Sequence, residues 1–132
     1  MKITADTNIL VRAVTGDDAR QSPLAQAELQ NAELVALTLP TLCELVWVLS
    51  QGYRIAAPEI AETLRRLMAG ANVAVNRPAV EAGLRLLNAG GDFADGVIAF
   101  EGRLLGADTF LSFDRKAVKL LDAQGEAVRL LA

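Results

Sequence analysis

Residues 33–51 read ELVALTLPTLCELVWVLSQ and join two hydrophobic patterns within one short stretch. The run ELVALT (33–38) is apolar, short and compatible with a β-strand. From position 40 the apolar residues recur at helical spacing as far as position 51. Pro40 stands where this helix would begin, a position at which the missing N–H costs nothing. A strand followed directly by a helix is typical of an α/β fold.

The same alternation continues along the chain. Helix-starting prolines recur at Pro23, Pro58 and Pro78. Because strands alternate with helices, we expect the α/β class, with a mostly parallel sheet covered on both faces. The further strands are predicted at 2–5, 72–76, 109–113 and 127–131, and the further helices at 23–32, 58–69, 78–88, 93–105 and 115–122.

Length and composition favour one folded domain over residues 1–132. Hydrophobic residues make up 52% of the chain and charged residues 22%, which is enough apolar material for a core. The net charge of -3 means that a polyanionic partner needs a local basic patch. Glu44 interrupts the most apolar stretch and Asp6 follows closely on the start, so we expect no membrane span, no signal peptide and a cytoplasmic location.

Histidine is absent from the sequence and cysteine occurs once, and both facts restrict the possible chemistry. The chain has no histidine, which excludes imidazole catalysis and histidine-bound metals. It has one cysteine, Cys43, which excludes an intrachain disulfide and a multi-cysteine zinc site. Any chemistry must therefore use carboxylates, hydroxyls, amides, lysine and arginine.

Three aspartates stand where a predicted strand ends or a helix begins: Asp6, Asp95 and Asp114. Helix capping is the alternative for Asp6 and Asp114, and for Asp92 it is the favoured interpretation. Parallel strands bring such positions to one edge of a sheet, where ligand sites gather.

Glu44 is the only charged residue between Leu34 and Tyr53. Its predicted helix is apolar nearly all round, so we expect Glu44 to be partly enclosed and to have a partner, since burying a lone carboxylate is costly. A surface position is the alternative. Carboxylates gathered at one edge would repel unless a cation lay among them, and an oxygen-only set favours Mg²⁺ or Mn²⁺. Such an ion suits phosphodiester hydrolysis by an activated water.

Four motifs in this order resemble the PIN-domain family, and within it the VapC-type toxin ribonucleases of bacterial toxin–antitoxin pairs. They are ADTNIL (5–10), LCELVWVL (42–49), GGDFADGVIA (90–99) and FLSFDRKAV (110–118). The resemblance implies a three-layer α/β/α fold with about five strands and a Mg²⁺- or Mn²⁺-dependent endoribonuclease site. It places the metal-binding and catalytic acids at Asp6, Glu44, Asp95 and Asp114.

Supporting roles also follow from the resemblance. Thr7 would orient carboxylates or water, Asn8 would brace the loop, and Asp92 would assist through water. Ser112 stands where relatives often carry threonine and keeps the hydroxyl. Gly96 stands where alanine or serine is common, which we expect to loosen that helix start.

The resemblance further implies a homodimer and a small antitoxin partner whose tail lies in an apolar groove. RNA contact needs local positive charge, for which Arg115 and Lys116 beside Asp114 are the candidates. The residues expected to form the groove are Trp47, Tyr53, Ile60, Leu64, Leu67 and Met68. For each of them an ordinary core position is the alternative.

Two other functions remain open from the sequence. A Mg²⁺-binding phosphoacceptor signalling domain could use Asp17, Asp18 and Lys116, but NVAVN (72–76) offers no acceptor aspartate. A catalytically inactive PIN-fold binding module would keep the fold without the reaction, although all four acidic positions are filled.

Overall fold

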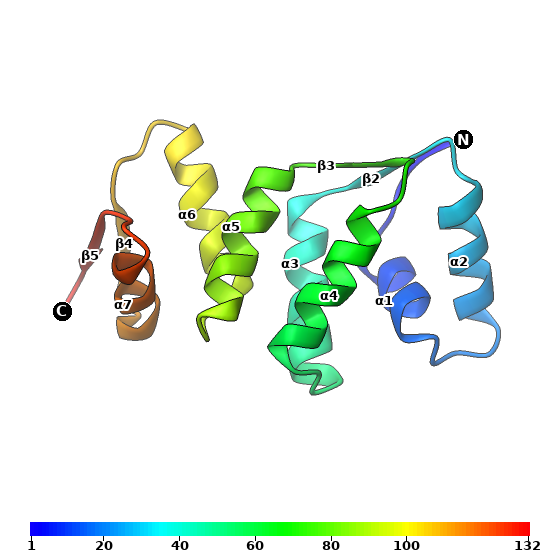
Figure 1. The fold of residues 1–132 in the computed structure, drawn as a ribbon, viewed down its shortest axis with the longest axis horizontal. Coiled ribbons are helices and arrows are strands. Elements are labelled where there is room, and N and C mark those ends of the chain that lie inside the picture. Colours follow the sequence, from blue (N-terminus) through cyan, green and yellow to red (C-terminus); the bar gives the residue numbers. More distant parts are fainter. The chain divides into compact units, whose positions relative to one another are not determined.

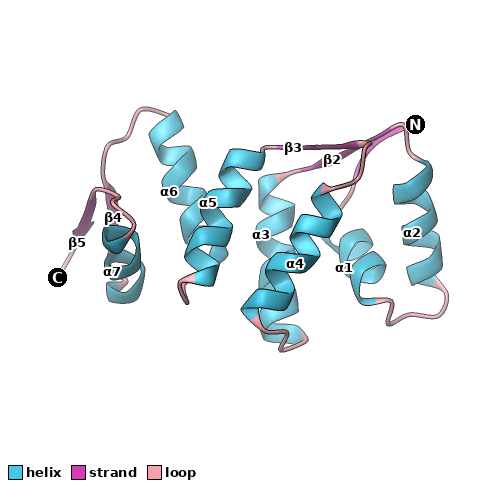
Figure 2. Cartoon of the chain, viewed as in Figure 1, coloured by secondary structure: helices cyan, strands magenta, loops and turns pink.

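Strands and helices alternate along the whole chain in the computed structural model, which describes residues 1–132 (Figures 1 and 2). The chain forms two compact units, Met1–Asn76 and Arg77–Ala132. Unit 1 contains β1 (Lys2–Thr4), α1 (Thr7–Thr15), α2 (Gln21–Asn31), β2 (Leu34–Leu37), α3 (Leu39–Trp47), the π-helix η1 (Val48–Gly52), α4 (Ala57–Met68) and β3 (Val73–Val75). Unit 2 contains α5 (Arg77–Asn88), α6 (Phe93–Leu104), β4 (Phe110–Ser112), α7 (Arg115–Ala123) and β5 (Val128–Leu130).

Unit 1 is built on a parallel sheet of three strands in the order β1-β2-β3. Val35 pairs with Ile3 on one side and with Val73 on the other, so β2 is the central strand. Alternate residues of β2 are buried, with Val35 at 2% and Leu37 at 3% exposure. The buried core residues of this unit include Leu10, Leu42, Leu45, Ile60 and Leu64.

Unit 2 has a parallel pair of strands, β4 and β5, in which Phe110 lies opposite Val128. Its helices α5 and α6 pack against each other through fully buried side chains, among them Leu84 and Phe93. A smaller cluster of Leu86, Ala99 and Leu121 joins α5, α6 and α7, with Phe110 and Val128 packed against it. This arrangement holds the starts of α6 and α7, where two of the predicted acids lie.

The α/β class and all five predicted strands are confirmed, each within one or two residues of its predicted ends. The strands form sheets of three and two, every strand pair is parallel, and the architecture is compatible with a three-layer α/β/α fold. The helix α1 was not among the predicted helices, because its apolar residues Ile9, Leu10 and Val11 are consecutive. The helix predicted at 40–51 is α-helical to Trp47 and continues as η1.

None of the helices combines the length and the hydrophobicity that crossing a bilayer requires.

Candidate metal and RNA site

Three aspartates of unit 2 lie near one another at the starts of two helices. Asp92 caps α6 by accepting a hydrogen bond from the Ala94 N–H at 3.1 Å. Asp95 lies in the first turn of the same helix and is half-buried. Asp114 caps α7, where its Oδ1 accepts from the Ala117 N–H at 3.1 Å. The N-terminus of a helix carries a partial positive charge, so aspartate side chains are favourable at the starts of both helices.

The surroundings of Asp95 disfavour the ionised form of its carboxyl group. Burial raises the pKa of its carboxyl above the usual value, and the negative charges of Asp92 and Asp114 raise this pKa further. A cation placed among the three carboxylates would remove this repulsion.

The donor chemistry fits Mg²⁺ or Mn²⁺, since these hard ions prefer carboxylate oxygens. Within either unit, no three acidic side chains are already close enough to enclose an ion. Asp92, Asp95 and Asp114 therefore supply an incomplete ligand set, which further oxygen donors would have to complete.

Asp6 follows β1 and caps α1. Its Oδ1 accepts a hydrogen bond from the Ile9 N–H at 3.0 Å, and its backbone is extended, as a capping residue requires. Thr7 and Asn8 are the first two residues of α1. The capping alternative is thus correct for Asp6, Asp92 and Asp114. A cap uses one carboxylate oxygen in each case, which leaves the other oxygen for a ligand.

Glu44 is exposed, and the expectation that it is enclosed in an apolar helix is wrong. The helix α3 buries Leu42, Leu45 and Val46 on one side, and Glu44 lies on the other. The sequence was misleading because Trp47, which is 64% exposed, shares the solvent-facing side with Glu44.

Unit 2 thus brings together Asp92, Asp95 and Asp114, whereas Asp6 and Glu44 belong to unit 1. The meeting of all four predicted acids stays a prediction.

Three further predicted residues lie beside Asp114. The Ser112 Oγ accepts a hydrogen bond from the Asp114 N–H at 2.9 Å, so this hydroxyl fixes the turn between β4 and α7. Arg115 and Lys116 are exposed at the start of α7. The Arg115 guanidinium donates to the Ala132 carbonyl at 3.4 Å. Two cations therefore stand next to the acidic group, on a surface that solvent reaches.

The core alternative is correct for three of the six residues expected to form the apolar groove. Ile60, Leu64 and Met68 are at most 4% exposed and belong to the core. The amphipathic pattern of α4 identified its core face and could not show which side of the helix borders a hollow. Unit 1 does contain hollows along α1 and α4, of about 490, 290 and 280 Å³. Tyr53 lines one of them, and Leu67 lines the other two; the remaining lining residues include Ala13, Val14, Thr63 and Arg66.

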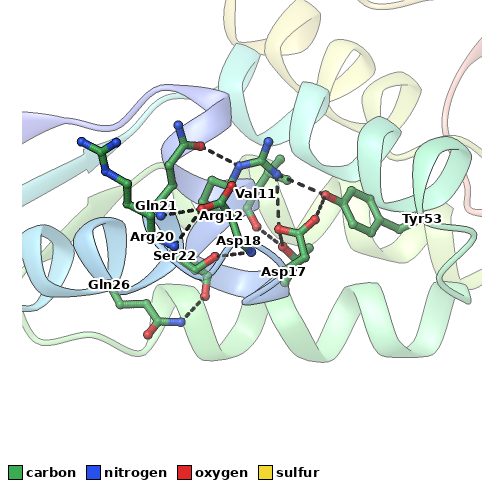
Figure 3. A network of polar contacts seen from close by, with 11 residues as sticks. Val11, Arg12, Asp17, Asp18, Arg20, Gln21, Ser22, Gln26 and Tyr53 are labelled. Atoms are coloured by element: carbon green, nitrogen blue, oxygen red, sulfur yellow. Dashed lines mark hydrogen bonds and ion pairs between the residues drawn. The ribbon is translucent and has the colours of Figure 1, made fainter.

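A polar network in unit 1 was not predicted (Figure 3). The Tyr53 hydroxyl donates to Asp17 Oδ2 at 2.5 Å, and Arg12 Nη1 donates to Asp17 Oδ1 at 3.2 Å. Arg12 Nε also donates to Gln21 at 3.0 Å. The hydrogen bond from Tyr53, followed by one from Thr15, lowers the pKa of Asp17. No sequence pattern indicates this network, because Tyr53 is 36 residues from Asp17 along the chain.

The network also bears on the signalling alternative. Asp17 is engaged by Arg12 and Tyr53, and Asp18 Oδ1 accepts from the backbone N–H groups of Arg20 and Gln21. Both carboxylates therefore have structural partners within unit 1, which disfavours them as a phosphoacceptor pair.

Comparison with curated proteins finds no match. A family model described as "PIN domain" matches residues 3–122, which covers all four motifs quoted above. PIN domains are a superfamily of nucleases that generally use divalent metals, so this match supports nuclease activity in general. Since the match spans most of the sequence, the chain belongs to the PIN domain family.

Proposed function

We propose that this chain is a Mg²⁺- or Mn²⁺-dependent endoribonuclease and acts as the toxin of a toxin–antitoxin pair. The observation that carries the proposal is the group of Asp92, Asp95 and Asp114, in which burial, and then repulsion from Asp92 and Asp114, raises the pKa of Asp95. The chain belongs to a family of nucleases, so a set of neighbouring carboxylates whose negative charges repel one another without a cation is best explained as a metal site.

In this proposal Asp95 and Asp114 hold the ion, Asp92 assists through water, and Asp6 and Glu44 complete the ligand set. A bound divalent cation would lower the pKa of a coordinated water and stabilise charge on the phosphodiester. Because the chain has no histidine, protons released at the site must pass to carboxylates or to solvent. Thr7 follows Asp6 directly and would orient that carboxylate through its hydroxyl.

The RNA backbone would contact Arg115 and Lys116, which are exposed beside Asp114. Such contacts neutralise phosphates and depend on salt concentration. Their position suits a polyanion despite the net charge of -3, because the two cations form a local patch.

The antitoxin tail would lie along the hollows between α1 and α4, beside Tyr53 and Leu67. The active form would be a homodimer in the cytoplasm. Co-expression with the product of a short upstream reading frame tests the toxin role, because a cognate antitoxin restores growth and co-purifies. Light scattering tests the dimer.

Incubation of the purified chain with transfer RNA and Mn²⁺ tests the nuclease. We expect cleavage that stops in excess chelator and that Asp95→Asn abolishes. Asp122→Asn is the matched control, because Asp122 is an exposed residue near the end of α7 and its substitution should leave cleavage unchanged. Full cleavage by Asp95→Asn, or in chelator, would refute the proposed mechanism.

A further inference from the structure

Helix α6, which carries Asp92 and Asp95, touches α5 backbone to backbone. Gly83 of α5 and Gly96 of α6 are both buried at this contact. A Cβ atom added at Gly96 would lie 2.5 Å from the Ala82 carbonyl oxygen and 2.9 Å from the Gly83 Cα. Carbon and oxygen atoms that are not bonded approach to about 3.3 Å. No side chain larger than hydrogen therefore fits at position 96 without moving the helices apart.

The contact lies directly beside the acidic group. Gly96 follows Asp95 in the chain, and Phe93, which is fully buried, follows Asp92. A Cβ atom added at Gly83 would lie 2.7 Å from ring atoms of Phe93 and 2.9 Å from Val97 Cγ2. Residues on both sides of Asp95 are thus pressed against α5, and the first turn of α6 has little freedom to shift.

We propose that Gly96, with Gly83 opposite it, is a positioning residue of the metal site. It sets the distance of the α6 N-terminus from α5 and so places Asp92 and Asp95 relative to Asp114. This inference rests on the proposed function, because positioning matters only if the acids bind an ion. The expectation that Gly96 loosens the helix start is wrong, since the missing side chain permits a close approach of the two helix backbones.

The expected size of the effect follows from the distances. Relieving a 2.5 Å contact to about 3.3 Å requires α6 to move by about 0.8 Å. Misplacing catalytic groups by about 1 Å can cost about 100-fold in rate. Residues that support metal ligands typically change metal affinity about 10- to 100-fold when they are replaced.

Gly96→Ala and Gly102→Ala make the same chemical change on the same helix. The nearest atom to a Cβ at Gly102 is the Ala107 Cβ at 4.0 Å, an ordinary contact. We would measure Mn²⁺ dissociation constants of the full chain by electron paramagnetic resonance, then kcat and KM for RNA cleavage. We expect Gly96→Ala to bind Mn²⁺ at least about 10-fold more weakly and to lose kcat more than KM. Raising the Mn²⁺ concentration should restore part of its kcat, and circular dichroism at each Mn²⁺ concentration checks that the folded fraction stays constant.

Equal Mn²⁺ affinity of Gly96→Ala and Gly102→Ala would overturn the positioning role. If Gly96→Ala fails to fold, Gly83→Ala takes its place, because its Cβ meets side-chain atoms of Phe93 and Val97 instead of the backbone of the facing helix. It should weaken Mn²⁺ binding in the same direction by a smaller factor, and wild-type affinity in that variant would also overturn the role. A wild-type chain that binds Mn²⁺ but cleaves no RNA would refute the proposed function alone, since the Mn²⁺ comparison still decides whether Gly96 positions the ligands.

Discussion

Asp6 has a capping role in the structure and a catalytic role in the proposal, and two substitutions separate these roles. Asparagine is as good a helix cap as aspartate, but it lacks the charge that holds a cation. Alanine loses both functions. We therefore predict that Asp6→Asn and Asp6→Ala both lose RNA cleavage and that only Asp6→Ala loses stability.

The magnitude follows from the single capping bond. Asp6 Oδ1 accepts from the Ile9 N–H at 3.0 Å, which satisfies one backbone donor in the first turn of α1. Loss of such a cap costs about 1 kcal/mol. For a chain of 132 residues this corresponds to a melting temperature lower by about 4 °C. Asp6→Asn should stay within about 1 °C of the wild type, because its side-chain oxygen keeps the bond.

Thermal unfolding followed by circular dichroism, in chelator, measures the capping role without any metal contribution. RNA cleavage in Mn²⁺ measures the catalytic role. Equal destabilisation of Asp6→Asn and Asp6→Ala would show that the cap does not stabilise α1 in the way described. Cleavage at the wild-type rate by Asp6→Asn would remove Asp6 from the metal site.

Three further variants test other residues. Asp95→Asn should raise the melting temperature of the metal-free protein at neutral pH but not near pH 3. Ionisation of Asp95 is disfavoured in the folded state, so the stability of the wild type falls as pH rises from 3.8, the usual pKa, through the raised pKa. A lower melting temperature at pH 7 would contradict this. Glu44→Gln should reduce cleavage at least about 100-fold while changing stability by less than about 0.5 kcal/mol in urea unfolding, because Glu44 is exposed; a large destabilisation would mean that it has a structural partner. Tyr53→Phe removes the hydrogen bond that is the largest cause of the lowered pKa of Asp17. In the wild type, ionised Asp17 stabilises the fold above pH 3.8, the usual pKa, and this contribution is lost as pH falls through the lowered pKa. The stability of the variant should therefore depend less on pH at acidic values than the wild type's, and an unchanged pH profile would exclude the hydroxyl bond as the cause.

Local patterns predicted most of the fold. The strands 34–37 and 73–75 and the proline-started helices α3, α4 and α5 follow from hydrophobic spacing and from helix-start residues, which are properties of neighbouring positions. The capping interpretations of Asp6, Asp92 and Asp114 were correct for the same reason, since a cap depends on residues two or three positions away.

The features that the sequence did not predict depend on residues that are distant along the chain. The exposure of Glu44 is decided by which side of α3 meets the core, and Trp47 made both sides look apolar. The role of Gly96 is decided by Ala82 and Gly83 on another helix, so the sequence suggested looseness where the structure has a tight contact. The capping position of Asp114 was predictable, but its electrostatic effect on Asp95 was inferred only from the family motif and a supposed sheet edge.

The parallel pairing of β1, β2 and β3 has a consequence for how the protein is made. Ile3 has no strand partner until the ribosome has added Val35, and Val35 waits for Val73 on its other side. At about 5–20 residues per second, each wait lasts roughly 2–8 s. During translation the first strand therefore lacks its parallel partner for seconds, a period in which an unpaired strand edge is open to pairing with another chain.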